Sequence, residues 1–316
     1  MSDKILLSYP VSAEDFDRAV RLFPQYRWAQ ADRDSEDREI ADAAIVYGKP
    51  RDHALALATK LKWLQSPSAG VEHLAALNVF KKGSFFLTTA AGMHESCVQH
   101  AIALLLSFSR RVALHARSQD SLHWESRAKL EVPLVLEGQT LGILGLGAIG
   151  RRIAVIAKVL GMRTIGFNHS GSHVAEPDET YSIAKLDQHL SRFDALIMIL
   201  PATPDTDNLL NADRIAKLPR HCIVVNVGRG NAIDEPALIT ALKEHCIAGA
   251  ALDVFKQEPL PSDSEFYSLP NCVITPHIGG NRPDYDAQAF AVFLDNLKRF
   301  TAGEPLKNVV ERGRGY

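Results

Sequence analysis

Short apolar runs alternate with amphipathic stretches in the first third of the chain. The amphipathic stretches "AEDFDRAVRLF" (13–23) and "HALALATKL" (53–61) have the spacing of helices that cover one face of a sheet. This alternation is typical of β-α units with a parallel sheet, so residues 1 to about 95 are predicted to form one α/β lobe. The apolar runs that predict its strands are "KILLS" (4–8), "AAIVYG" (43–48), "KWLQ" (62–65) and "SFFLTT" (84–89).

A second series of the same kind starts at residue 140. Continuous apolar strands separated by helices indicate a sheet that is buried on both faces, which predicts a doubly wound α/β domain. The predicted strands are "TLGILG" (140–145), "RTIGFN" (163–168), "ALIMIL" (195–200), "CIVVNVG" (222–228), "AGAALDV" (248–254) and "CVITP" (272–276). The amphipathic runs between them are 148–160, 185–192, 211–218 and 234–245.

Two further stretches predict helices that connect the lobes. Residues 93–118, "MHESCVQHAIALLLSFSRRVALHARS", are too apolar on one side for a loop, and we expect one long, largely buried helix there. Residues 283–305 predict an amphipathic helix that returns to the first lobe. The predicted domains are therefore 1–95 with 283–316, and 96–282.

Composition and charge narrow the classes of partner. The chain has 316 residues, which suggests roughly two domains. Lys and Arg number 35 against 37 acidic residues, so the net charge of −2 predicts no nucleic-acid or membrane partner. We find no signal peptide and no apolar segment of the ~18 residues that a membrane span needs. The four cysteines form no C-x-x-C pair and predict no metal site, and Cys222 and Cys272 lie in apolar runs where buried free thiols are expected. A cytoplasmic location follows as the expectation.

The segment "GLGAIG" (145–150) lies between a predicted strand and a predicted helix, and a second strand follows. In that context the first glycine permits a tight turn, the second allows a pyrophosphate to approach the backbone, and the third allows close packing of helix on strand. Phosphates would then bind the free amides at the helix N-terminus. The alternative is that the glycines serve only a tight turn. The loop residues predicted to bind a cofactor are Gly145, Gly147, Ala148, Ile149 and Gly150.

The choice of cofactor depends on the end of the second strand, where an acidic residue would bind the ribose 2′-hydroxyl of NAD. Asn168, His169 and Ser170 occupy that place, and their side chains can donate hydrogen bonds to a 2′-phosphate. NADP(H) is therefore the predicted cofactor. The alternative is an unselective turn that also accepts NAD(H).

Six ordered motifs then indicate a family. The chain resembles the D-isomer-specific 2-hydroxyacid dehydrogenases, of the glyoxylate/hydroxypyruvate reductase kind, and the match covers most of its length. The motifs are "LKWLQSPSAGVEHL" (61–74), "LGILGLGAIGRR" (141–152), "LPATPDTDNLLNADRIAKLP" (200–219), "IVVNVGRGNAIDEPALITAL" (223–242), "AGAALDVFKQEPLP" (248–261) and "VITPHIGG" (273–280).

The resemblance implies a flavodoxin-like substrate domain, a Rossmann-type cofactor domain, an active site in the cleft and a homodimer. The family's catalytic arginine, acidic residue and histidine fall on Arg229, Glu258 and His277. The resemblance also places substrate contacts on the amides of Ala69, Gly70 and Val71, and cofactor contacts on Pro201, Thr206, Val227 and Asp253.

The residue types suit these roles. Arg229 follows a strand, and a guanidinium can hold a carboxylate in two places. The imidazole of His277 exchanges a proton near neutral pH, and Glu258 would favour its charged form and fix its tautomer. Taken singly, each residue also fits a structural role, and Asp253 could merely satisfy buried amides.

The chain departs from the family near the start of its long helix. "VQH" (98–100) stands where the family commonly has A-E-H, which weakens a role for an acid there. Met93, His94 and Trp124 are predicted near an apolar specificity pocket, Trp124 from a neighbouring subunit. The histidines at 94, 100, 115 and 123 match no metal-ligand spacing and are interpreted as solvated or packed against helices.

The function predicted from the sequence is an NADPH-preferring reductase that converts glyoxylate, hydroxypyruvate or a similar short 2-keto acid to the (R)-2-hydroxy acid. One alternative is an NAD-linked dehydrogenase of the D-lactate or phosphoglycerate type. The length and the motifs resemble the shorter members of the family, which argues against a formate-oxidising relative. A dinucleotide-sensing interaction protein on the same scaffold is the alternative outside catalysis.

Overall fold

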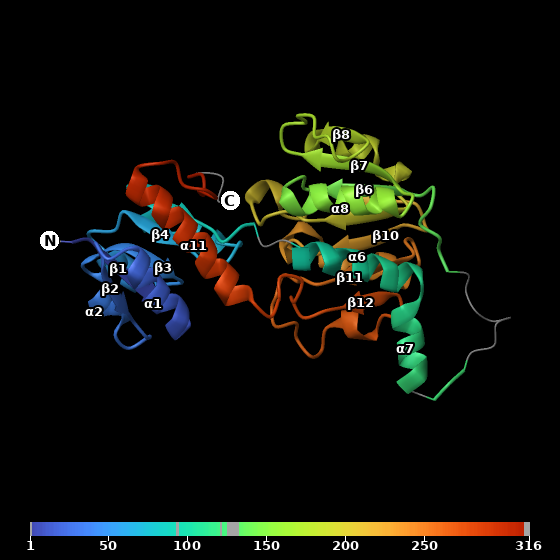
Figure 1. The fold of residues 1–316 in the computed structure, drawn as a ribbon. Coiled ribbons are helices and arrows are strands. Elements are labelled where there is room, and N and C mark those ends of the chain that lie inside the picture. The colour runs from blue at the N-terminus through green and yellow to red at the C-terminus, as the bar shows by residue number, and fades with distance from the viewer. Residues whose placement is uncertain (1, 93–94, 121, 125–132, 313–316) are drawn as a thin grey trace. The chain divides into compact units, whose positions relative to one another are not determined.

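The computed structural model describes residues 2–92, 95–120, 122–124 and 133–312. It divides into two compact units (Figure 1): unit 1 comprises Met1–Met93 and Arg282–Tyr316, and unit 2 comprises His94–Asn281. Within the described ranges, no helix is long and apolar enough to cross a membrane.

Unit 1 is built on a five-stranded parallel sheet with the order β2-β1-β3-β4-β5, which is the flavodoxin-like order. One apolar core lies under α1 and α11, and a second lies on the side of the other helices. The strands are β1 (Lys4–Ser8), β2 (Arg27–Gln30), β3 (Ala43–Gly48), β4 (Trp63–Gln65) and β5 (Phe86–Thr88). The helices are α1 (Ala13–Leu22), α2 (Glu36–Ile40), α3 (Asp52–Leu57), α4 (Glu72–Ala75), α5 (Asn78–Lys82) and α11 (Tyr285–Ala302).

The C-terminal helix α11 packs on the sheet of unit 1 beside α1 (Figure 1), so the chain returns to unit 1 after unit 2. Phe293 on this helix lies against Trp63 of β4, with ring centroids 5.3 Å apart. A polar link runs beside this contact, because fully buried Asn296 donates to Oε1 of Gln65 at 3.0 Å. Thr88 donates to the same oxygen at 2.7 Å, so helix and strands share one buried hydrogen-bond network.

Unit 2 contains a seven-stranded parallel sheet with the order β12-β11-β10-β9-β6-β7-β8. The chain order reverses between β6 and β9, as it does in doubly wound dinucleotide-binding sheets. Separate apolar cores fill the two faces, one under α6 and α8 and the other under α9 and α10. The strands are β6 (Thr140–Leu144), β7 (Arg163–Asn168), β8 (Glu179–Ser182), β9 (Ala195–Met198), β10 (Ile223–Asn226), β11 (Gly249–Leu252) and β12 (Cys272–Ile274).

The helices of unit 2 are α6 (Glu95–Ser109), α7 (Val112–Asp120), α8 (Ala148–Val159), α9 (Ala212–Ile215) and α10 (Glu235–Lys243). Short 3₁₀ helices complete the unit: η2 (Ile183–Gln188), η3 (Leu190–Arg192), η4 (Pro204–Thr206), η5 (Gly230–Ala232) and η6 (Glu265–Ser268). Together the two sheets confirm the predicted α/β fold class, and Cys222 and Cys272 are buried free thiols as expected.

Some predicted helices were wrong in detail. The long helix over 93–118 is two helices, α6 and α7, because Arg111 adopts a left-handed backbone with φ +61° and breaks the helical path. The first is largely buried, as expected, but α7 has no buried residue. The run 185–192 forms 3₁₀ turns instead of an α-helix.

We predict that Asn296→Ala lowers the free energy of unfolding of unit 1 by about 1–3 kcal/mol, because it removes the partner of buried groups. Denaturant unfolding followed by the fluorescence of Trp28 and Trp63, both in unit 1, measures this loss. Lys298→Ala, at an exposed position of the same helix, is the control and should change the value by less than about 0.5 kcal/mol. Equal stability of the two variants would show that the network is dispensable.

Candidate active site

The candidate residues of unit 2 follow the carboxyl ends of its parallel strands. Parallel strands end at the same edge of a sheet, and open α/β proteins bind ligands outside that edge. The local sequence therefore determines which residues reach the edge, because the candidates lie at the strand ends or within a few residues after them. The strand ends and the candidates after them are β6 with Gly145, β7 with Asn168, β9 with Pro201, β10 with Val227 and Arg229, β11 with Asp253, and β12 with His277.

The glycine loop between β6 and α8 has a separate physical reason for each glycine. Gly145 has φ +105°, and a Cβ there would lie 2.5 Å from the carbonyl oxygen of Ile199. A Cβ at Gly150 would collide with the carbonyl oxygen of Gly145, so helix and strand approach as closely as backbones can. At Gly147, by contrast, a Cβ would have no atom of the described residues within 4 Å beyond its own neighbours in the chain. The missing side chain therefore leaves open space at the helix N-terminus.

That helix terminus suits the phosphates of a dinucleotide. Gly147 is the N-cap of α8, and no side chain caps this end. The first amides of a helix lack intrahelical acceptors, and the helix dipole favours an anion there. The amides of Ala148 and Ile149 belong to this first turn. The N-terminus of α8 therefore offers unpaired amides and open space, which fit the pyrophosphate of a dinucleotide.

The residues after β7 form a turn that is bonded to itself. Oδ1 of Asn168 accepts the amide of Gly171 at 2.5 Å, and Nδ2 of Asn168 donates to the carbonyl oxygen of Ser172 at 2.9 Å. Asn168 therefore holds the turn together, while the side chains of His169 and Ser170 are exposed at its surface. The hydroxyl of Ser170 donates to Oγ of Ser172 at 2.8 Å. No acidic side chain belongs to this turn, which spans 168–172.

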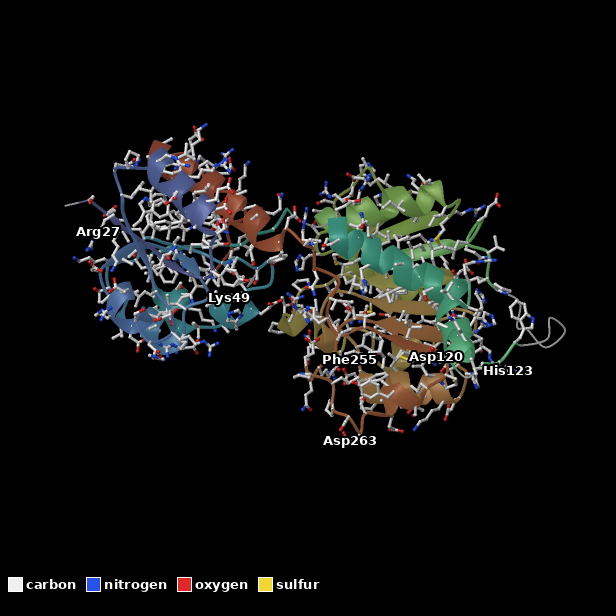
Figure 2. The ribbon with its side chains drawn as sticks, turned by 60° about the horizontal axis from the view of Figure 1, so that its bottom comes forward. Arg27, Lys49, Asp120, His123, Phe255 and Asp263 are labelled. Atoms are coloured by element: carbon white, nitrogen blue, oxygen red, sulfur yellow. The ribbon has the colours of Figure 1, made fainter. Side chains whose placement is uncertain are left out.

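Glu258 and His277 are joined by a direct side-chain hydrogen bond. Oε2 of Glu258 lies 2.6 Å from Nδ1 of His277, and both side chains are partly exposed. The other oxygen, Oε1, accepts the amide of Phe255, labelled in Figure 2, at 2.9 Å. A carboxylate can only accept, so Nδ1 of His277 carries a proton and Nε2 is the nitrogen that can exchange one with a ligand. This pairing fixes the orientation of the imidazole.

His277 stands on a backbone that is unusual for a residue with a side chain, with φ +52°. Its amide lies 2.9 Å from the carbonyl oxygen of Asp253 and 3.1 Å from that of Thr275. The carboxylate of Asp253 accepts the Thr275 hydroxyl at 2.6 Å and the amides of Ile278 and Gly279 at 3.0 and 2.9 Å. Asp253 is 1% exposed, so its buried carboxylate organises the loop that carries His277. The sequence left two interpretations of Asp253, a cofactor contact or an acceptor for buried amides. Its hydrogen bonds match the second.

The remaining cofactor candidates lie in ordered loops. Val227 follows β10 directly and is buried, and Nη1 of Arg229 donates to the carbonyl oxygen of Gly228 at 2.7 Å. Oγ1 of Thr206 donates to the carbonyl oxygen of Pro201 at 2.7 Å, so these two candidates close one turn. The structure therefore brings Pro201 together with Thr206, as it does Glu258 with His277.

The substrate candidates of unit 1 lie between β4 and the short helix α4. Val71 is the N-cap of α4 and is buried, whereas Ala69 is exposed. Within the described part of the chain, the amides of Ala69, Gly70 and Val71 have no protein acceptor, so they can receive an anion. Met93 and His94, which the sequence placed near a specificity pocket, lie outside the described residues.

Two side chains of α6, Cys97 and His100, also reach this loop region, and their sequence pattern did not predict it. The sulfur of Cys97 lies 4.0 Å from the carbonyl oxygen of Val227, and burial, with the charge of Asp253, raises the pKa of its thiol to about 11. Nε2 of His100 lies 2.9 Å from Oγ1 of Thr275. The only signal in the sequence was "VQH", read there as a departure from the family pattern.

Comparison with known proteins agrees with this geometry. The family model described as "D-isomer specific 2-hydroxyacid dehydrogenase, NAD binding domain" matches residues 102–279. A glyoxylate reductase of Pyrococcus horikoshii is 31% identical over 260 residues, which are 81% of this chain and 78% of that protein.

Two solved structures align over nearly the whole chain. A D-isomer specific 2-hydroxyacid dehydrogenase family protein of Aeromonas salmonicida is 34% identical, with a TM-score of 0.84, and the alignment covers 99% of this chain and 100% of that one. The NADPH-dependent glyoxylate/hydroxypyruvate reductase of Sinorhizobium meliloti, in complex with NADP and sulfate, is 28% identical, with a TM-score of 0.84 and all of both chains covered. With its parallel sheets, its glycine loop and these matches, the chain belongs to the family of NAD(P)-dependent D-isomer specific 2-hydroxyacid dehydrogenases.

Proposed function

We propose that this dehydrogenase is an NADPH-preferring reductase of short 2-keto acids, such as glyoxylate or hydroxypyruvate, and that its product is the (R)-2-hydroxy acid. The observation that carries the proposal is the 2.6 Å pair of Glu258 with His277 at the sheet edge that also bears the glycine loop. Such a pair supplies a positioned proton donor beside a dinucleotide-binding loop. The similarity to two glyoxylate reductases supports the substrate class.

The chain's own residues supply the acid and the anchors of the proposed reaction. A bound NADPH supplies the hydride that reduces carbon 2 of the keto acid. His277 holds a proton at Nε2 and gives it to the carbonyl oxygen, while Glu258 stabilises the imidazolium through Nδ1. Arg229 binds the substrate carboxylate with its planar guanidinium. The amides of Ala69, Gly70 and Val71 are further proposed ligands of that carboxylate.

The turn 168–172 supports the preference for NADPH. It lacks the carboxylate that would bind a free ribose 2′-hydroxyl and repel a 2′-phosphate. The exposed imidazole of His169 can donate a hydrogen bond to that phosphate, and the Ser170 hydroxyl can do so by rotating away from Ser172. The Sinorhizobium meliloti reductase, whose structure holds NADP, agrees with this choice.

We propose a cytoplasmic location. The four cysteines are free thiols, which fits the reducing environment of the cytoplasm.

We also propose a homodimer that forms through unit 2. Helix α7 buries none of its residues, and an isolated helix of this length is barely stable in water. Val112 is 58% exposed on it, and Leu122 and Trp124 just beyond it are more than 90% exposed. Figure 2 shows His123 out beyond Asp120, the end of α7. These apolar side chains support association with a second copy.

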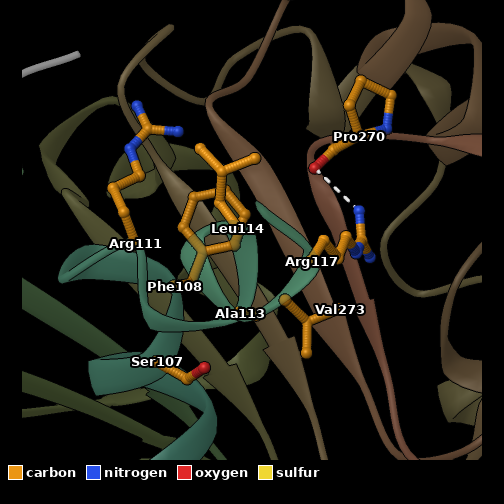
Figure 3. Close-up of a pocket in the computed structure, with 8 residues that line it drawn as sticks. All are labelled: Ser107, Phe108, Arg111, Ala113, Leu114, Arg117, Pro270 and Val273. Carbon is orange, nitrogen blue, oxygen red and sulfur yellow. Dashed lines mark hydrogen bonds between the residues drawn. The ribbon is translucent and has the colours of Figure 1, made fainter. Parts of the chain in front are cut away.

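A shallow pocket at the α6–α7 junction lies beside the same helix. Figure 3 shows Phe108 and Leu114 on one side of it, while Arg117 donates to the carbonyl oxygen of Pro270 on the other. None of the proposed catalytic residues lines this pocket. Its lining combines apolar side chains with Arg111 and Arg117, and its place beside α7 fits a contact with another subunit better than a place for the substrate.

The first prediction concerns turnover. His277→Ala should lower kcat about 10²- to 10⁴-fold, because the carbonyl oxygen loses its proton donor. The measurement is the near-ultraviolet absorbance of NADPH and of NADH with glyoxylate, hydroxypyruvate, pyruvate and phenylpyruvate, and the wild-type enzyme is the reference. If the wild-type protein binds both cofactors but consumes neither with any acid, the chain is a dinucleotide sensor and the proposal fails.

The second prediction concerns the cofactor. Asn168→Asp keeps the size of the side chain and adds the missing negative charge, so kcat/KM with NADPH should fall at least about tenfold relative to NADH. The NADH measurement on the same variant is the internal control, because the two cofactors differ only in the 2′-phosphate. A wild-type enzyme that uses NADH better than NADPH would contradict the proposed preference.

The third prediction concerns assembly. Leu114→Glu and Trp124→Glu place charges on the exposed apolar side chains of this region and should convert a dimer into monomers. Light scattering coupled to gel filtration measures the mass, and Gln119→Glu, which adds the same charge to a polar position of α7, is the control. A wild-type protein that is monomeric at micromolar concentration would refute the dimer.

A further inference from the structure

His100 reaches from α6 to the loop that carries the proposed proton donor. Its Nε2 lies 2.9 Å from Oγ1 of Thr275 and 3.2 Å from Oδ1 of Asp253, residues far from it in sequence. The side chain of His100 is 18% exposed and that of Asp253 is 2% exposed. The contact is thus largely shielded from water, where a hydrogen bond to a carboxylate is strong.

The direction of these bonds can be assigned. The Thr275 hydroxyl donates its single proton to Oδ1 of Asp253 at 2.6 Å, so its oxygen can only accept from His100. The carboxylate of Asp253 also only accepts. Both neighbours of Nε2 are therefore acceptors, which places a proton on Nε2 of His100.

The same carboxylate determines the path of the His277 loop. Oδ1 of Asp253 accepts the amide of Ile278, and Oδ2 accepts the amide of Gly279. The ring of His100 also packs on Gly279, where a Cβ would lie 3.3 Å from Cδ2 of His100. His277 lies between Thr275 and Ile278, which Asp253 holds by hydrogen bonds. These fixed neighbours keep the backbone of His277 at φ +52°, a conformation that is otherwise unfavourable for a residue with a side chain.

We propose that His100 is a positioning residue for His277. By donating from Nε2 to Thr275 and Asp253, it fixes the 275–279 loop against α6 and holds the imidazole of His277 in line with Glu258. The inference rests on the proposed function, in which His277 is the proton donor, and it assigns α6 a part in that chemistry. His100 itself transfers no proton to the substrate.

Three variants separate the hydrogen bond from simple packing. His100→Leu keeps much of the volume and removes the donor, whereas His100→Gln places an amide N–H close to the position of Nε2. Gln99→Ala, at an exposed neighbouring position of α6, is the matched control. One readout is the kcat and KM for NADPH and the keto acid. The other is the tautomer of His277 in the cofactor-free protein, from ¹⁵N-histidine NMR, with its signal assigned by its loss in His277→Gln.

His100→Leu should lower kcat about ten- to hundredfold with KM changed less than about threefold, because a displaced donor loses alignment while the binding groups stay. The His277 signal should move from the Nδ1–H form towards a mixture of the two neutral tautomers. His100→Gln should recover most of kcat and the wild-type signal, and Gln99→Ala should match the wild type.

An unchanged His277 signal and kcat in His100→Leu would overturn the inference, and so would a loss that His100→Gln does not restore. If the wild-type enzyme reduces no keto acid but the His277 signal still shifts in His100→Leu, the proposed function fails while the positioning role stands. The NMR measurement therefore distinguishes the two failures.

Discussion

The parallel pairing of the strands in unit 2 is the constraint on which the candidate site depends. Because neighbouring strands run in the same direction, β6, β7, β9, β10, β11 and β12 all end at one edge. Residues that are more than a hundred positions apart in sequence, such as Gly145 and His277, therefore lie at the same edge of the sheet. The strand directions place them there, and no direct bond between them is needed. The apolar cores on both faces hold the strands, and with them that edge, in place. The functional residues can therefore lie in the loops, while the packed strands stabilise the fold.

Within that edge, buried polar groups determine the local geometry. The buried carboxylate of Asp253 accepts hydrogen bonds from the Thr275 hydroxyl and from two loop amides. These donors compensate for the water that the carboxylate loses on burial. The same loop presents His277 to Glu258 with a fixed tautomer. On the other side of the topological switch point, the glycine loop offers backbone amides where side chains would obstruct a phosphate. The proposed proton donor and the proposed anion site thus follow different strands of one sheet.

Much of the fold followed from apolar patterns, and the exceptions have physical reasons. Strand β2, "RWAQ", and strand β8, "ETYS", were not predicted, because both are edge strands that stay half exposed and lack an apolar run. The break before α7 occurs at Arg111, where no Gly or Pro marks the left-handed turn. The glycine loop was predicted from its spacing together with its place between a predicted strand and a predicted helix, whereas the family resemblance brought Glu258 and His277 together. The contact of His100 with Thr275 joins residues 175 positions apart, which no local pattern encodes.

The central claim is that the loops at this sheet edge reduce a 2-keto acid by transfer of a hydride and a proton. The most direct measurement uses NADPH deuterated on either face of nicotinamide carbon 4, with glyoxylate as the acceptor and mass spectrometry of the glycolate formed. We predict one deuterium on carbon 2 of glycolate from one labelled form and none from the other. Glycolate without deuterium from both forms, or no glycolate at all, would contradict it.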